Sequence, residues 1–138
     1  MPIVNVVCGI IVNEQKEILV CQRGEGRSLA GKWEFPGGKI ETDESAESAL
    51  KRELHEELGV EISIVNSLTS VLWNYGQTEI MLHPFVCRIN GGVLRATEHQ
   101  AIAWCTLADL QNYDWADADL PIVDEIQQLF RGELHFSP

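Results

Sequence analysis

The segment GKIETDESAESALKRELHEELGV, residues 38–60, decides the expected fold. Its apolar residues recur at the spacing of one helical stripe and predict a helix over about residues 44–58. These apolar positions are Ala46, Ala49, Leu50, Leu54 and Leu58. Thr42 or Asp43 can cap the start of this helix, and Gly59 can end it.

Three glutamates of the predicted helix, Glu53, Glu56 and Glu57, lie within an arc of roughly 100° on one face. This face borders the apolar stripe, so the carboxylates should lie at the edge of the core. Like charges at this spacing repel one another. Arg52 can pair with Glu56 but cannot neutralise all three. Hard oxygen ligands suit Mg²⁺ or Mn²⁺, so the face is a candidate metal site. A solvated acidic face is the alternative.

Strand-like runs flank the helix on both sides. The runs before it are residues 4–12 and 17–23, which we expect to pair as a hairpin. The runs after it are residues 62–72, 79–89 and 101–105, with Gly91 and Gly92 as the turn between the last two. A helical turn at residues 106–110 and a closing helix at residues 121–130 follow. This order predicts an α/β fold in which helices flank a mixed β-sheet.

Length and charge restrict the class of protein. The 138 residues fit one domain spanning residues 1–138. No apolar run approaches the ~20 residues needed to cross a bilayer, and no signal-peptide pattern is present, so we expect a cytoplasmic protein without a membrane partner. The net charge of −11 disfavours a nucleic-acid polymer, which needs a Lys/Arg patch, but allows a polyphosphate that arrives with Mg²⁺.

The four cysteines are scattered and form no C-x-x-C pair. Zinc and redox motifs are therefore poorly supported. Each cysteine lies in an apolar stretch, so we expect buried, reduced thiols.

The fixed positions of residues 38–60 read G-x5-E-x7-R-E-U-x-E-E-x-G-U, where U is a bulky aliphatic residue. This pattern resembles the Nudix box, the signature of the Nudix hydrolases. The preceding WEFPGGK, residues 33–39, is similar to the MutT-like branch of that family. The resemblance implies an α/β/α sandwich with a mixed β-sheet flanked by helices. It also implies Mg²⁺-dependent hydrolysis of a nucleoside diphosphate linked to another group, with Mn²⁺ as a substitute ion.

The resemblance also assigns roles within the box. Glu53, Glu56 and Glu57 would be metal ligands, joined by the backbone carbonyl of Gly37. The paired glycines would allow unusual backbone angles and a close approach of the backbone to a metal or phosphate. Arg52 would hold the glutamates in position, and Glu44 would support the junction between loop and helix.

The reaction of MutT-like enzymes is water attack on the β-phosphorus of a nucleoside triphosphate, which gives a nucleoside monophosphate and pyrophosphate. A metal ion screens the phosphate charge and lowers the pKa of a bound water, and a carboxylate accepts the proton. Glu53 and Glu98 are the candidate bases, and Glu98 would also complete the metal site. Arg23 and Lys39 are candidate phosphate contacts, with a plain surface role as the alternative. We expect His99 to be a bystander, although a phosphate contact would also suit it.

Base recognition is expected at Phe35 and Asp119. Phe35 falls where the resemblance places a wall of the base pocket, and Val4 and Val6 could line it; core packing is the alternative. Asp119 stands where typical MutT proteins carry an Asn that reads 8-oxoguanine. An ionised Asp only accepts hydrogen bonds and suits the amino group of cytosine, whereas an Asp protonated by burial could read an oxopurine. Capping the closing helix is its alternative role.

The runs EHQA (98–101), WC (104–105) and DLP (119–121) resemble the MutT-like branch that acts on CTP, dCTP and their modified forms. We therefore expect these substrates, with 8-oxo-dGTP as a further candidate. At residues 77–79 the chain has QTE where this branch often has an Arg, which leaves the preferred base open. The alternatives are a Nudix hydrolase of another diphosphate, such as ADP-ribose, and a non-catalytic Nudix sensor, although no box carboxylate is missing. The sequence leaves monomer or homodimer open.

Overall fold

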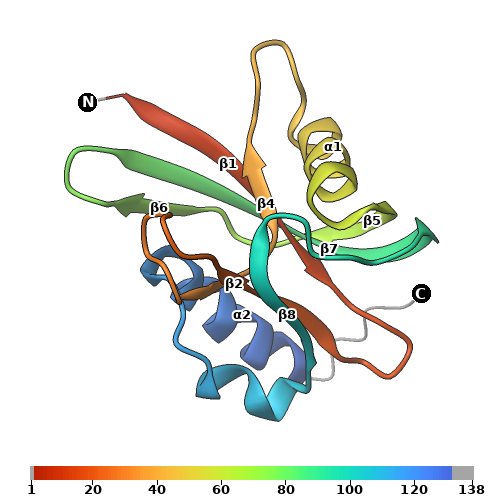
Figure 1. Cartoon of the computed structure of the whole chain (residues 1–138). Coiled ribbons are helices and arrows are strands. Elements are labelled where there is room, and N and C mark those ends of the chain that lie inside the picture. The colour runs from red at the N-terminus through yellow and green to blue at the C-terminus, as the bar shows by residue number, and fades with distance from the viewer. Residues whose placement is uncertain (1, 132–138) are drawn as a thin grey trace.

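The computed structural model describes residues 2–131, in which four strands precede one helix and four more strands precede the closing helices (Figure 1). The strands are β1 (Ile3–Ile11), β2 (Ile18–Arg23), β3 (Trp33–Glu34), β4 (Gly37–Lys39), β5 (Val60–Ser67), β6 (Val71–Asn74), β7 (Glu79–Gly92) and β8 (His99–Cys105). The helices are α1 (Ala46–Leu58) and α2 (Leu120–Arg131), with short 3-10 helices η1 (Leu107–Asn112) and η2 (Asp117–Asp119). Within residues 2–131 no helix is long and apolar enough to cross a membrane. The predicted domain, residues 1–138, extends outside this range and stays a prediction.

The larger sheet has the strand order β4-β1-β7-β5, with β6 also paired to β7. Strands β1 and β7 run parallel, from Ile3 opposite Glu79 to Ile11 opposite Cys87, while the other pairs are antiparallel. The prediction of a mixed sheet is therefore confirmed.

The predicted hairpin between the first two strands is wrong. Strand β2 lies in a second, antiparallel sheet of order β3-β2-β8, and a single bridge between Val12 and Ile18 links it to the end of β1. The physical reason is that β7 pairs with β1 along its whole length, while β4 pairs with Val6 to Cys8 on the other edge. Only the end of β1 is left open to β2, at the bridge between Val12 and Ile18.

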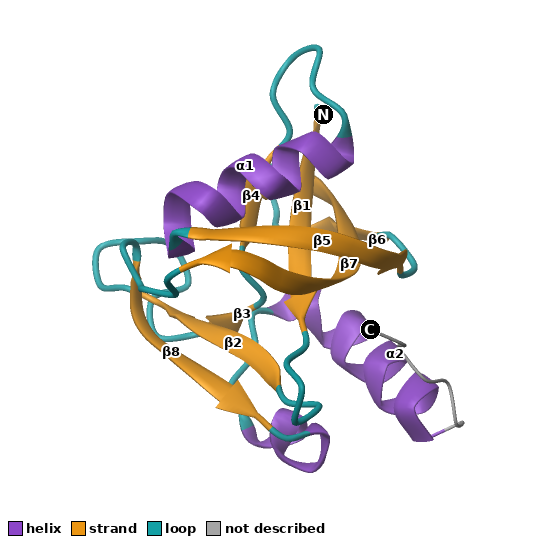
Figure 2. Ribbon diagram, turned by 90° about the vertical axis from the view of Figure 1, so that its right-hand side faces the viewer, coloured by secondary structure: helices purple, strands orange, loops and turns teal. Residues whose placement is uncertain are grey.

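The two faces of the larger sheet are covered differently (Figure 2). Helix α1 lies across one face, whereas the second sheet and α2 lie on the other side. Strand β1 serves both layers, because Val7 and Ile11 pack with the residues of α1 and Ile10 packs with those of α2. Gly9 faces α1, and a Cβ there would lie 3.0 Å from Leu54 Cδ1. Its missing side chain lets α1 lie close to the sheet.

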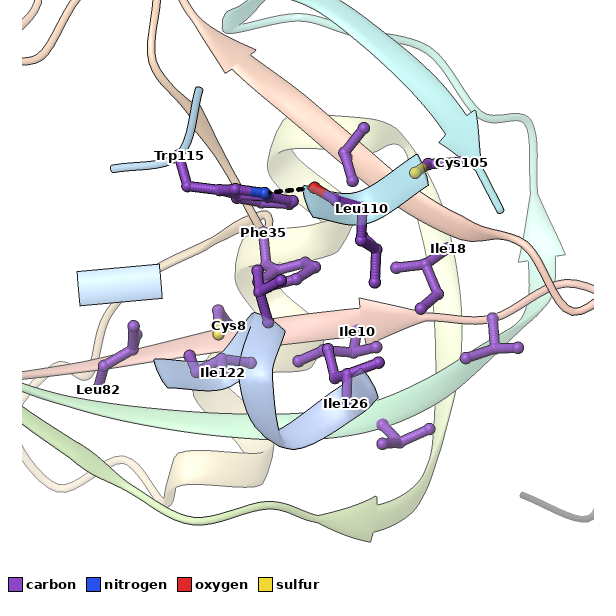
Figure 3. Packing of buried hydrophobic residues seen from close by; sticks show 14 of the residues in the cluster. Cys8, Ile10, Ile18, Phe35, Leu82, Cys105, Leu110, Trp115, Ile122 and Ile126 are labelled. Atoms are coloured by element: carbon purple, nitrogen blue, oxygen red, sulfur yellow. Dashed lines mark hydrogen bonds between the residues drawn. The ribbon is translucent and has the colours of Figure 1, made fainter. Parts of the chain in front are cut away.

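The core beneath α2 is built around two stacked aromatic rings (Figure 3). The ring centroids of Phe35 and Trp115 lie 4.7 Å apart, and the Trp115 indole N–H donates to the Leu110 carbonyl at 2.7 Å. Ile122 and Ile126 of α2 pack beside them. This packing joins η1, α2 and the segment between β3 and β4 into one layer.

All four cysteines are buried free thiols, as predicted. Burial raises the pKa of each, so these thiols stay protonated at neutral pH.

The boundaries of α1 differ from the prediction at one end. Ser45 caps the start, and its hydroxyl accepts the Ser48 N–H at 3.1 Å. Thr42 and Asp43 therefore do not cap the helix, because they belong to the loop before it, in which Asp43 has a φ of 67°. Gly59 ends the helix with a φ of 72°, as predicted.

Two predictions about the later strands are also wrong. The run at 62–72 is two strands, β5 and β6, because the Leu68 N–H turns to the Pro84 carbonyl between them. Gly91 and Gly92 do not form the turn between strands but end β7, opposite Glu61 and Val60. A Cβ at Gly92 would overlap the carbonyl of Gly59, so the close pairing of these strands requires glycine there.

Candidate active site

The site begins at the two glycines of β4, which pair with β1. A Cβ at Gly37 would overlap the Val7 carbonyl, and one at Gly38 would overlap the carboxylate of Glu53. Neither glycine has a positive φ. Close approach of neighbouring atoms therefore accounts for glycine at both positions. The absence of a side chain at Gly38 makes room for the Glu53 carboxylate against the backbone of β4.

Arg52 fixes the carboxylates at the start of the box. Its Nε and Nη2 donate to Glu44 at 2.7 and 2.9 Å, and its Nη1 donates to Glu53 at 2.8 Å. Nη2 also donates to the Lys39 carbonyl at 3.1 Å, which ties α1 to the end of β4. The predicted pair with Glu56 is longer, at 3.6 Å. Arg52 is therefore placed to orient Glu53, and Glu44 holds Arg52.

The charge on Glu44 follows from these bonds. The hydrogen bonds from Arg52 and, second, from the Glu41 N–H lower the pKa of Glu44 to about 2. The hydrogen bonds to Glu44 and, second, to Glu53 raise the pKa of Arg52. The pair is fully ionised at neutral pH, and its forked geometry restricts rotation of the guanidinium.

Glu57 is the most buried of the box glutamates, with 6% of its surface exposed. Burial raises the pKa of Glu57 well above its ordinary value, and the neighbouring Glu53, Glu98 and Glu34 raise it further. A positive charge among these carboxylates would lower the pKa of Glu57 again, and hard oxygen donors suit a divalent cation. The donor chemistry therefore fits a metal ion.

The side chains of the predicted metal ligands do not converge on a single ion position. In residues 2–131 no three His, Cys, Asp or Glu side chains are arranged to hold one metal ion. Glu53 is engaged by Arg52, and the side chain of Glu56 is 57% exposed. Glu98 is also exposed. The structure brings the predicted ligands to one end of α1, and their role as ligands stays a prediction.

A buried polar chain runs beside the glutamates. Arg23 Nη1 donates to Glu34 Oε1 at 2.7 Å, and His99 Nε2 lies 2.9 Å from Glu34 Oε2. Burial opposes ionisation of Glu34, but the bonds from His99 and Arg23 together lower its pKa. Sequence reasoning gave no role to Glu34 and expected His99 to be a bystander. The one available signal was the position of Glu34 between Trp33 and Phe35 in the box-flanking run.

A pocket of about 590 Å³ opens next to β4. Such a volume is typical of small-molecule sites. Its lining comes from the first strands, the loop after β2, the turn between β6 and β7, and η2. The lining residues are Val6, Val7, Cys8, Arg23, Arg27, Ser28, Leu29, Glu34, Phe35, Gly37, Gly38, Lys39, Tyr75, Thr78, Ile80, Leu82, Ala116, Ala118 and Asp119. Val4, expected as a lining residue, is not among them.

The predicted substrate residues meet in this pocket. Arg23, Lys39, Phe35 and Asp119 all line it. Arg23 is also held by protein groups, because its Nε donates to the Ser28 carbonyl at 2.7 Å. Phe35 belongs to the core and also lines this pocket, and its role as a wall of a base pocket stays a prediction. Contacts with phosphate and base stay predictions.

Asp119 is buried at the end of η2, with 6% of its surface exposed. Its Oδ2 accepts the Phe35 N–H at 2.9 Å. This bond joins η2 to the segment before β4, and capping of α2 by the other carboxylate oxygen stays a prediction. Burial raises the pKa of Asp119 to about 8, with Glu34 adding to the effect and the Phe35 N–H opposing it. The adjacent Ala118 N–H donates to the Tyr75 hydroxyl at 2.8 Å.

Comparison with known proteins shows which family shares this fold and site. The sequence model of the NUDIX domain matches residues 2–126. The chain is 40% identical over 129 residues to the CTP pyrophosphohydrolase of Escherichia coli (strain K12), covering 94% of this chain and 95% of that protein. It is 36% identical over 130 residues to the putative 8-oxo-dGTP diphosphatase 2 of Mycobacterium tuberculosis (strain ATCC 25618 / H37Rv), covering 92% and 90%.

Solved structures agree. The solution structure of the E. coli ORF135 protein superposes with a TM-score of 0.83 at 37% identity, covering 96% of this chain and 94% of that one. A MutT protein from Methanosarcina mazei Go1 gives a TM-score of 0.84 at 23% identity, which shows the shared fold. The α/β/α sandwich with its box on α1 is that of a pyrophosphate-cleaving hydrolase. This chain belongs to the NUDIX family, in its MutT-like part. Nudix hydrolases act on nucleotide substrates and generally need a divalent metal ion.

Proposed function

We propose that this chain hydrolyses CTP, dCTP and their modified forms to the nucleoside monophosphate and pyrophosphate, with 8-oxo-dGTP as a further substrate. The observation that carries the proposal is a single pocket lined both by the buried Asp119, the proposed base reader, and by Gly38, which packs against Glu53. The names of the relatives, a CTP pyrophosphohydrolase and a putative 8-oxo-dGTP diphosphatase, support the same substrate class.

The proposed cofactor is Mg²⁺, held by Glu53, Glu56, Glu57, Glu98 and the backbone carbonyl of Gly37. When bound, this ion screens the phosphate charges and makes water a better nucleophile. Arg52 keeps the Glu53 carboxylate in one orientation through the bond of 2.8 Å. Glu53 or Glu98 accepts the proton of the attacking water.

Base selection is proposed to depend on a protonated Asp119. Since its pKa is raised to about 8, this carboxyl carries its proton at neutral pH. Oδ2 accepts the Phe35 N–H, so the proton belongs on Oδ1. The acid then offers a donor beside an acceptor. Cytosine presents the matching pair in N3 and its N4 amino group, and 8-oxoguanine presents O6 and N7–H.

The test is a hydrolysis panel with Mg²⁺ at pH 7. CTP, dCTP, 5-methyl-dCTP, 8-oxo-dGTP, dATP and ADP-ribose are compared by kcat/KM, with pyrophosphate and phosphate measured separately. We expect pyrophosphate from the triphosphates, with the cytosine nucleotides ranked first. ADP-ribose as the best substrate, or phosphate in place of pyrophosphate, would contradict the proposal.

A further inference from the structure

His99 lies between two carboxylates that belong to different parts of the site. Its side chain is 1% exposed, and it begins β8 directly opposite Arg23 of β2. Nε2 lies 2.9 Å from Glu34, whereas Nδ1 lies 3.9 Å from Oε1 of Glu57. Among the described residues, Nδ1 is the one buried side-chain nitrogen or oxygen without a hydrogen-bond partner. Such an atom is costly in a folded protein and calls for an explanation.

Glu34 determines that Nε2 of the His99 imidazole is a hydrogen-bond donor. This carboxylate already accepts from Arg23 at 2.7 Å, and ionised carboxylates only accept, so His99 Nε2 donates to it. Nδ1 therefore faces Glu57 across a distance too long for a hydrogen bond. An ionised Glu57 carboxylate also only accepts, so a shift of this group toward the ring forms a hydrogen bond when Nδ1 carries a hydrogen as well as Nε2.

The backbone holds this arrangement in place. Thr97, two residues before His99, donates through its hydroxyl and its N–H to the Glu57 carbonyl at 2.8 and 3.1 Å. The Arg95 N–H donates to the Leu58 carbonyl at 2.9 Å. The loop that leads to His99 is thus hydrogen-bonded to the last turn of α1. The position of the ring relative to Glu57 is set by these bonds.

We propose that His99 is a positioning residue that orients the Glu57 carboxylate for metal binding and connects it, through Glu34, to Arg23 in the substrate pocket. The proposal rests on the proposed metal-dependent function. Carboxylates that bind a metal ion are commonly held by hydrogen bonds from neighbouring side chains, and loss of such a partner weakens metal binding. His99 does not line the pocket, so its effect should reach substrate only through its neighbours.

The test compares three variants of the full chain. His99→Phe removes both ring nitrogens while filling the space. His99→Gln can place an amide near Nε2 and keep the bond to Glu34, and His99→Asn can place one near Nδ1, toward Glu57. The control is His83→Phe, because the ring of His83 bonds Ser70 and Asn5 on the larger sheet.

Two readouts separate positioning from simple packing. The first is the affinity for Mn²⁺ without substrate, measured by electron paramagnetic resonance. We expect His99→Phe to weaken it by about 10- to 100-fold, His99→Asn to keep more affinity than His99→Gln, and the control to match wild type. The second is steady-state kinetics with CTP, where kcat should fall and KM should change by less than about threefold, since the ring lies outside the pocket.

The proposal is overturned if His99→Phe binds Mn²⁺ within about twofold of wild type. If that variant does not fold, as judged by thermal unfolding in EDTA, the other two decide. Wild-type affinity in both His99→Gln and His99→Asn would then overturn the proposal. A wild-type protein that binds Mn²⁺ but cleaves no triphosphate would contradict the proposed function alone, because the Mn²⁺ comparison needs no substrate.

Discussion

Replacing Asp119 by Asn should change how stability depends on pH. Asn has the same shape, and its amide oxygen can still accept the Phe35 N–H that Asp119 accepts at 2.9 Å. The acid has a folded pKa of about 8 against an ordinary value of 3.8. Between these values the folded protein keeps a proton that the unfolded chain has released. The free energy of unfolding of the wild type therefore falls as the pH rises through this window, and the variant lacks that contribution.

The size of the effect follows from one proton. The difference in slope between the two proteins is about 1.4 kcal/mol per pH unit inside the window. From pH 5 to pH 7 the variant should gain roughly 3 kcal/mol relative to wild type. Above pH 8 both states of the wild type are ionised, so the difference should level off.

The assay is urea unfolding of both proteins at pH 5, 6, 7 and 8, with equal m-values as the check that the same surface is exposed. Asp117→Asn is the matched control, because Asp117 is an exposed carboxylate of the same 3-10 helix. A constant difference between wild type and Asp119→Asn from pH 5 to pH 8 would refute the reasoning. It would mean that Asp119 is ionised in the folded protein.

The same substitution tests base reading. If the neutral acid reads cytosine, kcat/KM for CTP in the wild type falls as the pH rises through about 8. Asp119→Asn should keep its activity on CTP at pH 7 and lose that decline, because an amide also offers a donor beside an acceptor. A large loss of CTP hydrolysis at pH 7 would instead indicate recognition by the ionised carboxylate.

Two further substitutions test the geometry around the pocket. Gly38→Ala would push a Cβ into the Glu53 carboxylate, so kcat/KM for CTP should fall about 100-fold. The control is Gly24→Ala, whose Cβ would meet its nearest atoms at 3.9 Å and which should stay near wild type. Equal rates in the two variants would contradict the packing argument. Tyr75→Phe removes the acceptor of the Ala118 N–H, so it should lower the free energy of unfolding by about 1 kcal/mol and raise KM for CTP more than it changes kcat. Unchanged stability and KM would show that this bond does not hold the pocket wall.

The box helix could be predicted from sequence because its signals are local. These signals lie close together in the sequence. They are the apolar stripe of α1, Gly59 at its end, and the short spacing between Glu44 and Arg52. The same local view chose the wrong cap, because Thr42, Asp43 and Ser45 are all capping types. It also paired β2 with β1, since strand propensity does not say which edge is free.

The buried polar contacts could not be predicted, because they join residues that are distant in the sequence. Glu34 and His99 are 65 positions apart, and Phe35 and Asp119 are 84 apart. The sequence alone does not show whether a polar side chain is exposed to solvent or buried between two carboxylates. The fold alone decided that His99 is buried beside Glu57, and this burial led to its proposed role.

We expect pyrophosphate release to depend on a metal ion and on the carboxylates at the end of α1. The most direct measurement is the initial rate of pyrophosphate release from CTP as a function of Mg²⁺ concentration, for wild type and Glu57→Gln. Glu47→Gln is the control, since Glu47 lies exposed in the first turn of the same helix. We predict a wild-type rate that requires Mg²⁺, a loss on the order of 100-fold in Glu57→Gln, and no loss in the control. A Glu57→Gln protein as fast as wild type would contradict the account.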